Sequence, residues 1–585
     1  MANPFGKQNE LESILLSFRK SFLTVGLFSF FINLLMLLPA IYMLQVYDRV
    51  LMSRNETTLL VLTVIVLGLY GLMGVLEFAR SMVLIRVSAQ LDMKLDNRIF
   101  AAAFEHKLGL GVGSPGQALS DLTSVRQFLT GNGLFAFFDA PWTPIYIVVI
   151  AFFHPLLGLM ALIGAIVLFA LAWATEAATR KPLADANNLG VASSNFANNN
   201  LRNAEVIEAM GMLSHLLKRW FTRQKQYLSL QGVASERGAT ISAMTKFFRI
   251  ALQSLILGAG AYLAINGTIT PGAVIAGAIL MGRTLAPVEL AISVWKQLIA
   301  ARSAYHRLDQ LLTAYPAREP NMGLPAPKGA ISVEGATTTP PGSQNVILKN
   351  VTLKINAGEV VGVIGPSASG KSTLARLLVG VWPTRTGKVR LDGADIYAWD
   401  KADLGPYVGY LPQDIELFEG SIAENIGRFT EIDSARVIAA AQSAGVHEMI
   451  LRFQNGYDTL IGEGGSVLSA GQRQRIALAR ALYGDPSLIV LDEPNSNLDD
   501  QGEAALIRAV RELKQRGKTV VVVSHRVSIL GVVDKLLVLS DGALQLFGPR
   551  DEVMAALNKQ NQPAASPAPT VLAVPVISAP AAQPQ

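Results

Sequence analysis

Residues 360–373 read VVGVIGPSASGKST and place a glycine-rich turn between two ordered elements. The apolar run 360–364 is typical of a buried strand, and the residues that follow Thr373 continue in a helical pattern. In this setting backbone N–H groups can close around phosphate oxygens, while a lysine reaches the terminal phosphates and a hydroxyl binds Mg²⁺. A bare glycine-rich turn is the alternative, but spacing and context both favour a phosphate loop. The loop is predicted to comprise Gly365, Pro366, Ser367, Ala368, Ser369, Gly370, Lys371, Ser372 and Thr373, with Ser372 as a magnesium ligand.

A second candidate site follows another apolar run. Residues 488–491 read LIVL and are followed by Asp492 and Glu493. Because a parallel strand delivers such residues to the mouth of its sheet, Asp492 is predicted to hold Mg²⁺ and Glu493 to polarise an attacking water. Two surface acids would be the simpler interpretation without the upstream loop. Together the motifs predict an α/β P-loop nucleotide-binding domain.

A third motif narrows the class of nucleotide-binding domain. Residues 468–472 read LSAGQ and open a helix that is predicted to run to Leu482. Free N–H groups and the positive end of the helix dipole favour a phosphate at such a position. We therefore predict that Ser469, Gly471 and Gln472 contribute to an anion site for a γ-phosphate. A plain helix cap is the alternative for this pentapeptide taken alone.

The composition indicates two unlike halves. Hydrophobic residues make up 51% of the 585 residues, and nearly all long uncharged runs fall before about residue 295. A membrane part is therefore expected. The absence of cysteine excludes disulfides, thiolate metal sites and a cysteine nucleophile. The net charge of +6 comes from basic residues between apolar runs, which favours membrane topology over nucleic-acid binding.

Six stretches are long enough to span a bilayer, which takes roughly 20 apolar helical residues. They are the run between Lys20 and Asp48, residues 57–76, 134–153 and 156–175, and two runs within 250–282 that are separated by the turn signals at 266–267 and 271–272. Lys and Arg favour cytosolic loops and gather after the second and fourth stretches. The amino terminus and everything after the sixth helix are therefore predicted to be cytosolic.

These patterns predict the domain organisation. A proline-rich stretch reads as an interdomain linker, and an uncharged tail rich in Pro, Ala, Ser and Gln reads as disordered. The predicted parts are a cytosolic segment 1–20, a six-helix transmembrane domain 21–312, a linker 313–330, an ATPase domain 331–558 and a disordered tail 559–585.

The three nucleotide motifs resemble those of ABC transporters, with Ala470 where their signature usually has glycine. The resemblance implies ATP as the nucleotide and adds Gln413 as a magnesium-binding Q-loop residue, His525 as the catalytic switch histidine and Asp499 as a D-loop residue. In this family each ATP lies between the phosphate loop of one domain and the signature of another, so a homodimer is expected. The aromatic residue that usually stacks on adenine is missing from residues 335–342.

The membrane half resembles type I protein secretion ATPases of Gram-negative bacteria, in particular the exporters of alkaline proteases and lipases. The segments that carry the resemblance are 42–50 (YMLQVYDRV), 138–142 (FDAPW) and 285–289 (LAPVE). It implies an inner-membrane exporter, in contact with membrane lipid, that moves an unfolded metalloprotease or lipase with a C-terminal signal. It also implies an inner-membrane adaptor and an outer-membrane tunnel protein as partners. An ABC lipid or drug flippase is the alternative.

Several charged residues near the predicted helices have local interpretations. Asp139 is expected to cap the third helix and Asp48 to lie in an exposed turn. Arg283 and Glu289 fall in or just below the sixth helix, where exposure to lipid would be unfavourable. They are therefore expected, together with Asp139, to supply the few polar groups of a pathway for cargo.

Overall fold

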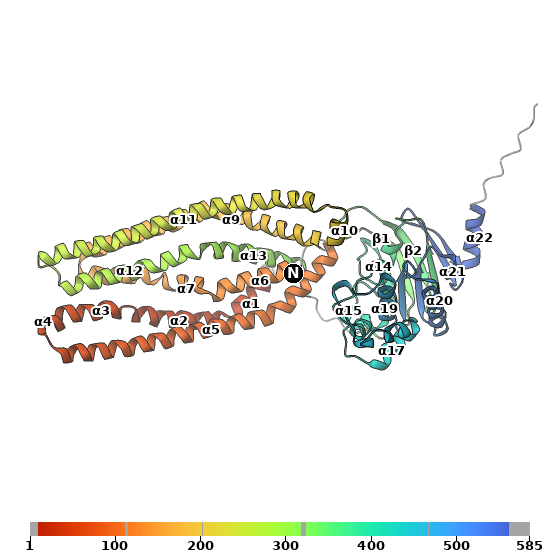
Figure 1. Ribbon diagram of the computed structural model, residues 1–585, viewed down its shortest axis with the longest axis horizontal. Helices are drawn as coiled ribbons and strands as arrows, with labels where there is room; N and C mark the ends of the chain where they lie inside the picture. The colour runs from red at the N-terminus through yellow and green to blue at the C-terminus, as the bar shows by residue number, and fades with distance from the viewer. Residues whose placement is uncertain (1–9, 111–114, 202, 318–322, 466, 561–585) are drawn as a thin grey trace, which may run out of the picture. The chain divides into compact units, whose positions relative to one another are not determined.

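The computed structural model describes residues 10–110, 115–201, 203–317, 323–465 and 467–560 (Figure 1). The chain divides into two compact units, Met1–Arg318 and Glu319–Gln585, and each is described by itself. The division falls inside the predicted linker 313–330. The prediction for the tail 559–585 lies, beyond Gln560, outside the described residues.

The first unit is helical. Its elements are α1 (Glu10–Ser17), α2 (Arg19–Leu35), α3 (Leu38–Gln45), the π-helical turn η1 (Val46–Val50), α4 (Leu51–Ser53), α5 (Glu56–Leu110), α6 (Pro115–Thr130), α7 (Asn132–Asp139), α8 (Trp142–Phe153), α9 (Pro155–Leu201), α10 (Ala204–Ala209), α11 (Leu213–Ile265), α12 (Pro271–Ser293) and α13 (Trp295–Ala314). Within the described residues, six helical segments are long and apolar enough to cross a membrane.

Three of these helices continue far beyond the apolar stretches that the sequence marks. Helix α5 has 55 residues, α9 has 47 and α11 has 53. A helix of 55 residues is about 80 Å long, whereas the hydrocarbon core of a bilayer is about 30 Å thick. The sequence predicts where the spans lie but not the length of the helices, because charged residues end an apolar run without ending a helix.

Helix α12 occupies a central place in the first unit. It packs against α3, α8, α9 and α11, and its Leu280, Met281 and Leu285 lie in one buried cluster with Tyr146 and Ile150 of α8. Helices α9 and α11 lie side by side along most of their length (Figure 1). A separate buried cluster joins α1, α5, α6 and α13. The bundle therefore has a core around α12 and a second core around α13.

Asp139, the last residue of α7, belongs to a polar cluster among α2, α5 and α8. Its Oδ1 accepts a hydrogen bond from Asn33 Nδ2 at 2.6 Å and lies 3.9 Å from Nη1 of the buried Arg80. Arg80 also donates to Ser29 Oγ at 3.2 Å, and the Tyr146 hydroxyl donates to the Asn33 carbonyl at 2.9 Å. The interpretation of Asp139 as a helix cap is wrong, because α8 begins without a side-chain cap. Its carboxylate compensates a buried guanidinium instead.

Asp48 lies in η1 and binds the N-terminus of α12. Its carboxylate accepts hydrogen bonds from the Gly272 N–H at 2.8 Å and from the hydroxyl of Thr270, the N-cap of that helix. A Cβ atom at residue 272 would lie 2.7 Å from this carboxylate, so the close approach requires glycine. The interpretation of Asp48 as part of an exposed turn is therefore wrong. The half-buried anion lies where the helix dipole favours negative charge.

The second unit is an α/β domain. Its strands are β1 (Ile331–Thr338), β2 (Leu348–Ile355), β3 (Val360–Ile364), β4 (Thr386–Leu391), β5 (Ala394–Asp395), β6 (Val408–Leu411), β7 (Gly420–Ser421), β8 (Leu460–Ile461), β9 (Leu488–Asp492), β10 (Thr519–Val523), β11 (Lys535–Ser540) and β12 (Ala543–Pro549). Its helices are α14 (Lys371–Leu378), α15 (Lys401–Leu404), α16 (Ile422–Ile426), α17 (Ser434–Ser443), α18 (His447–Leu451), α19 (Ala470–Leu482), α20 (Asp500–Gln515), α21 (Val527–Leu530) and α22 (Arg550–Gln560), with 3₁₀ turns η2 (Gly405–Tyr407), η3 (Gly456–Asp458) and η4 (Glu463–Gly465).

The main sheet has the strand order β12-β11-β3-β10-β9-β6. All neighbouring strands are parallel except β12, which runs antiparallel to β11. A second sheet has the order β2-β1-β4-β5. Since the parallel strands end at one edge, the loops after β3, β6, β9 and β10 are brought together there. These loops carry the phosphate loop, Gln413, Glu493 and His525.

Both faces of the main sheet are buried. In β9, Ile489 and Leu491 pack into the cluster that includes α16, α17, α19 and α20. Leu488 and Val490 pack into the other cluster, with α14 and the strands of the second sheet. This explains why the strands read as continuous apolar runs rather than as alternating patterns.

Removing the carboxylate of Asp139 should destabilise the first unit. Asp139→Ala leaves the Arg80 guanidinium buried without its anion, at a cost of about 2–4 kcal/mol when the partial exposure of Asp139 is considered. Thermal unfolding of the detergent-solubilised protein measures the loss. Asp185→Ala, which removes an exposed carboxylate of α9, is the control and should unfold at the wild-type temperature. Equal midpoints for both variants would contradict the compensating role of Asp139.

Candidate functional site

The phosphate loop lies between β3 and α14, and two glycines allow its course. Gly365 has φ 155° and Gly370 has φ 97°. A Cβ atom at residue 365 would lie 2.1 Å from the carbonyl oxygen of Leu539, and one at residue 370 would lie 2.7 Å from Leu348 Cδ2. Ala368, between them, also adopts a left-handed φ of 64°. The loop therefore forms a tight cradle that larger residues at 365 and 370 would block.

Lys371 is held inside this cradle. Its side chain is buried, and its Nζ donates to the carbonyl oxygens of Gly365 at 3.0 Å and Pro366 at 2.8 Å. Burial lowers the pKa of Lys371 below its ordinary value, although the carboxylates of Glu493 and Asp492 act in the opposite direction. Thr373, in the first turn of α14, is buried beneath the loop. The Lys371 ammonium group is thus fixed by backbone carbonyls of the phosphate loop itself.

Asp492 has the features of a ligand for a cation. Its side chain is 1% exposed, and neither carboxylate oxygen has a hydrogen-bond partner among the described residues. Burial raises the pKa of Asp492, and the nearby Ser372 hydroxyl only partly offsets this effect. A buried carboxylate without a donor is unfavourable, and a bound cation would satisfy both oxygens. Asp492 and Ser372 therefore fit the predicted Mg²⁺.

A chain of hydrogen bonds joins Ser372 to Glu493 through Gln413. The Ser372 hydroxyl donates to Gln413 Oε1 at 3.3 Å, and Gln413 Nε2 donates to Glu493 Oε2 at 3.2 Å. Glu493 has a left-handed φ of 50°, and its N–H donates to the Val523 carbonyl at the end of β10 at 3.0 Å. Such a conformation costs roughly 1–2 kcal/mol for a residue with a side chain. The structure thus brings together the loop, Gln413 and the acidic pair.

Gln474 is a site residue that the sequence analysis missed. It lies on α19 with 1% exposure, and its Nε2 donates to the Glu493 carbonyl at 3.3 Å and to Ser496 Oγ at 3.4 Å. Its Oε1 accepts from the N–H of Asn497 at 2.9 Å. The helix that begins at Ser469 therefore fixes the backbone around Glu493. The sequence offers one signal for Gln474, which is a polar residue at a position of the helix otherwise typical of apolar residues.

Ser469 is the N-cap of α19 and forms a reciprocal capping box with Gln472. Ser469 Oγ accepts from the Gln472 N–H at 3.3 Å, and Gln472 Oε1 accepts from the Ser469 N–H at 2.8 Å. A Cβ atom at Gly471 would lie 2.8 Å from the Asn497 carbonyl, so this glycine permits a close backbone contact. Ala470 is exposed. Among the described residues, no hydrogen bond joins Ser469 to the phosphate loop of its own chain.

Asp499 and His525 are less closely tied to the site. Asp499 is the N-cap of α20 and accepts a hydrogen bond from the Gly502 N–H at 2.8 Å. His525 follows β10 by two residues, and its exposed side chain makes no hydrogen bond within the described part of the chain. His525 therefore lies at the same sheet edge as Glu493, and within the described residues no hydrogen bond joins the two. Residues 335–338, where the adenine-stacking aromatic was missing, end β1.

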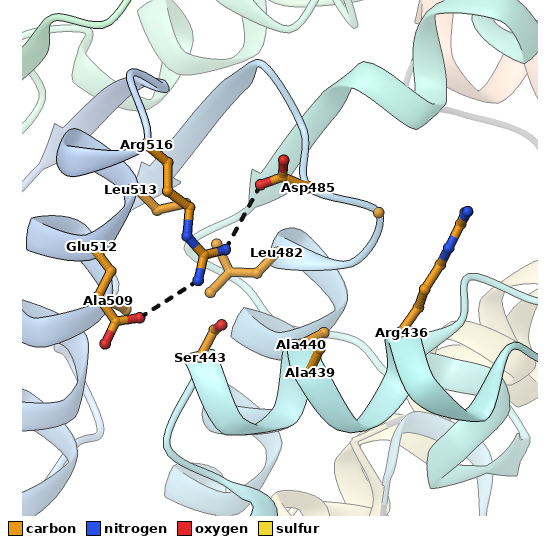
Figure 2. A pocket seen from close by; sticks show the side chains of 11 residues that line it. Arg436, Ala439, Ala440, Ser443, Leu482, Asp485, Ala509, Glu512, Leu513 and Arg516 are labelled. Carbon is orange, nitrogen blue, oxygen red and sulfur yellow. Dashed lines mark ion pairs between the residues drawn. The ribbon is translucent and has the colours of Figure 1, made fainter.

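A separate pocket lies between α17, α20 and the turn before β9 (Figure 2). Its volume is about 340 Å³. Arg516 forms an ion pair with Asp485 at 3.8 Å, and one along its own helix end with Glu512 at 4.0 Å. It is lined by none of the predicted site residues, because it lies at the edge of the sheet where β9 begins.

Comparison with known proteins identifies both units. Residues 348–496 match the family described as ABC transporter, and residues 22–288 match the ABC transporter transmembrane region. The type I secretion system ATP-binding protein PrsD of Rhizobium meliloti (strain 1021) is 46% identical over 564 residues, which cover 96% of this chain and 97% of that protein. The chain belongs to the type I secretion ABC transporters.

More distant proteins share the same organisation. The toxin RTX-I translocation ATP-binding protein of Actinobacillus pleuropneumoniae is 29% identical and covers 93% of this transporter, which spans 78% of its length. The solved structure of a bacterial Atm1-family ABC exporter with ATP bound has a TM-score of 0.79 at 23% identity, covering 94% of this chain and 99% of that one. This transporter is therefore a multi-pass membrane protein with the ABC exporter fold and an ATP-hydrolysing, ATP-driven protein exporter.

The geometry separates the roles of Glu493 and Lys371. If Glu493 is the catalytic base, as the sequence predicts, Glu493→Gln keeps the loop and the side-chain volume but removes the proton acceptor, so ATP should still bind while hydrolysis falls by about 10²- to 10⁴-fold. Lys371→Ala removes the ammonium from the cradle and should weaken ATP binding itself. Nucleotide binding and phosphate release by the purified transporter measure the two effects. Hydrolysis near the wild-type rate in Glu493→Gln would exclude Glu493 as the catalytic base.

Proposed function

We propose that this transporter works as a homodimer in the bacterial inner membrane and exports an unfolded protein of the metalloprotease or lipase class that carries a C-terminal signal. It would deliver the cargo through an inner-membrane adaptor protein to an outer-membrane tunnel protein. The observation that carries the proposal is the hydrogen-bond chain Ser372–Gln413–Glu493 under the phosphate loop, in a chain 46% identical to a type I secretion ATP-binding protein.

The residues of the ATPase unit divide the work of hydrolysis. Backbone N–H groups of the phosphate loop, other than at Pro366, and the Lys371 ammonium bind the phosphates of ATP. Ser372, Gln413 and Asp492 would hold Mg²⁺, which would supply positive charge to offset the negative charge of the phosphates during hydrolysis. Glu493 accepts a proton from the attacking water, and its strained backbone keeps its carboxylate beside Gln413. His525, at the same sheet edge, is proposed to reach the terminal phosphate when the site closes.

The dimer follows from the position of the signature. Ser469 lies at the N-terminus of α19, and nothing in its own chain's phosphate loop bonds to it within the described residues. We propose that Ser469, Gly471 and Gln472 bind the γ-phosphate of ATP held by the partner subunit, with Asp499 in the loop between the two sites. Exposed Ala470 leaves this face of the helix open in the same way as the usual glycine. Each dimer would then contain two composite sites.

The orientation follows from the ends of the helices. The turns at His154 and at Asn266–Thr270 carry no Lys or Arg, and the turn that precedes α5 carries Arg49 and Arg54. The long extensions of α5, α9 and α11 together carry far more basic residues. Because basic residues favour the cytosol, we propose that these extensions, the amino terminus and the ATPase unit are cytosolic.

The polar groups of the bundle differ in their partners. Glu289 forms an ion pair with Arg249 at 3.2 Å, and Asp139 is bound by Asn33 and lies beside Arg80. Arg283 is half-buried on α12 and has no ion pair or hydrogen bond among the described residues. Of the three residues expected to line a pathway, we therefore propose Arg283 as the group that faces the cargo.

The composite sites can be tested by complementation. A Lys371→Ala chain and a Ser469→Arg chain each form homodimers with two broken sites, whereas a mixed dimer retains one intact site. Purified mixed dimers should hydrolyse ATP at up to about half the wild-type rate, because a dimer has two equivalent sites. Homodimers of each variant, measured in parallel, give the background. Mixed dimers no more active than that background would contradict the sandwich arrangement.

The cargo pathway can be tested by charge reversal. Arg283→Glu should reduce secretion of a metalloprotease with a C-terminal signal by about tenfold or more while basal ATP hydrolysis persists, because a reversed charge in a low-dielectric path costs several kcal/mol. Extracellular protein is measured against total protein in cells that also supply the adaptor and the outer tunnel. Arg302→Glu, an exposed charge reversal on α13, and Arg283→Lys are the controls.

Two outcomes would contradict these assignments in different ways. Wild-type secretion by Arg283→Glu would place this residue away from the cargo. Failure of the wild-type transporter to release any protein, with both partners present, would instead favour a lipid or drug flippase.

A further inference from the structure

Arg428 follows α16 and has an unusual backbone. Arg428 and Phe429 adopt φ values of 57° and 56°, although neither is glycine. Two consecutive left-handed residues with side chains are costly, and such strain persists only where the surrounding contacts enforce it. At this position the strain turns the Arg428 side chain inward, toward α19 and β6.

The guanidinium of Arg428 is bound by backbone carbonyls alone. Its Nε donates to the Arg480 carbonyl at 3.0 Å and its Nη2 to the Ala481 carbonyl at 3.1 Å. Its Nη1 donates to the carbonyls of Gly405 at 2.8 Å and Val408 at 3.2 Å. No carboxylate pairs with it within the described residues. One side chain therefore joins the last turn of α19 to the beginning of β6.

The last turn of α19 needs such a donor. The residue after the helix, Tyr483, has φ −62° and ψ 134°, so the chain leaves the helix in an extended conformation before it turns at Gly484, which has φ 83°. The final carbonyls of a helix then lack partners inside the helix, and the dipole makes this end negative. Burial lowers the pKa of Arg428 to about 10, which leaves the side chain charged at neutral pH. A cation at this end therefore satisfies both the hydrogen bonds and the charge.

Arg480 makes a second connection from the same turn of α19. Its Nη2 donates to the Glu416 carbonyl at 3.1 Å, and its guanidinium lies 5.3 Å from the ring centroid of Phe418. Glu416 follows Gln413 by three residues. The end of α19 is thus bonded to the chain both before β6, through Arg428, and after β6, through Arg480. Strand β6 and the Gln413 loop lie between these two attachments.

Direct backbone contact also restricts the movement of α19 relative to β6. A Cβ atom at Gly409, in β6, would lie 2.3 Å from the Ala481 carbonyl oxygen. The strand and the helix end therefore meet without a side chain between them. Arg428 bonds to Ala481 and to Val408, on either side of this contact.

We propose that Arg428 is a positioning residue for ATP hydrolysis, which holds the Ser469 helix in register with the strand that carries Gln413. The inference rests on the proposed roles of Ser469 and Gln413. Helix α19 has 13 residues and a length of about 20 Å, so a tilt of about 5° at its clamped end would move Ser469 by nearly 2 Å. A misplacement of about 1 Å in an enzyme site can cost on the order of 10²-fold in rate. The hydrogen bonds that Arg428 makes at one end of α19 therefore control whether Ser469, at the other end, reaches the γ-phosphate.

The kinetic test uses the full-length transporter and three variants. Arg428→Met removes all four hydrogen bonds. Arg428→Lys retains the positive charge but loses the planar guanidinium, whose three nitrogens donate to separate carbonyls. Arg436→Met is the matched control, because Arg436 is an exposed arginine of α17 on the rim of the pocket in Figure 2, and its one ion pair among the described residues is with Asp433 at 3.1 Å. Arg428→Met should lower kcat per folded protein by about ten- to a hundredfold while KM for ATP changes less than about twofold, because the phosphate loop is unaltered. Arg428→Lys should recover part of the loss, and the control should behave as wild type.

A distance measurement separates positioning from mere stability. The chain contains no cysteine, so spin labels can be attached to cysteines introduced at exposed Gln442 of α17 and Asp403 of α15. The distance between them should be narrowly distributed in the wild-type background and broadened by Arg428→Met. A residue that only stabilised the fold would lower the yield of folded protein and leave both kcat and this distribution unchanged.

Including Ser469→Arg distinguishes this inference from the function on which it rests. If Ser469→Arg loses activity while Arg428→Met retains the wild-type kcat and distance distribution, the positioning role of Arg428 is overturned and the composite site stands. If Ser469→Arg remains fully active, the proposed role of the signature serine fails, and so does the positioning role of Arg428.

Discussion

The ATPase site depends on a backbone position that no side chain could share. At residue 365 the chain lies so close to β11 that a Cβ atom would be 2.1 Å from the Leu539 carbonyl oxygen. Only glycine permits this approach. From there the loop turns back over β3, which lets Lys371 bond to two carbonyls of the loop and brings Ser372 to Gln413. The positions of Lys371 and Ser372 therefore depend on steric exclusion at residue 365.

The amount that the sequence could predict differs from residue to residue. The phosphate loop and the pair Asp492-Glu493 could be predicted because their spacing encodes a strand followed by a turn, which is a local property. Gln413 and His525 required a resemblance to a known family, since a single polar residue after a strand has no distinctive pattern. Gln474 could not be predicted, because its partners are backbone and hydroxyl groups about twenty residues away in the sequence.

In the membrane unit, too, contacts between residues far apart in the sequence could not be predicted. The six spans were visible as apolar runs, but the contact between Asn33 and Asp139 joins residues 106 positions apart. Asp139, two residues before Pro141, resembles a helix cap in the sequence, and Asp48 resembles part of a turn. Both are instead used between helices, one beside a buried arginine and the other at the N-terminus of α12. Tertiary partners decide such cases, and one sequence does not reveal them.

Arg80 is buried and Arg428 is half-buried, and they illustrate two ways of accommodating a cation inside a protein. Arg80 lies beside a carboxylate, whereas Arg428 is surrounded by carbonyl dipoles and has an arginine, Arg480, as its charged neighbour. A carboxylate supplies full opposite charge, but its own desolvation reduces the gain. Carbonyls at a helix end are already desolvated and lack partners, so a guanidinium there satisfies groups that folding would otherwise leave unpaired.

The length of α5 means that one continuous helix is exposed to two solvents. Between Glu56 and Glu77 this helix carries no charge and most of its apolar side chains are exposed on the bundle, so lipid would surround them and a broken backbone hydrogen bond would find no water to replace it. Its charged later part extends into an aqueous environment, where water competes for the same groups and only packing against neighbouring helices keeps them closed. Amide protons should therefore exchange slowly in the first part regardless of packing, and at a rate set by local contacts in the second. The boundary between these regimes would mark the membrane surface on the helix itself.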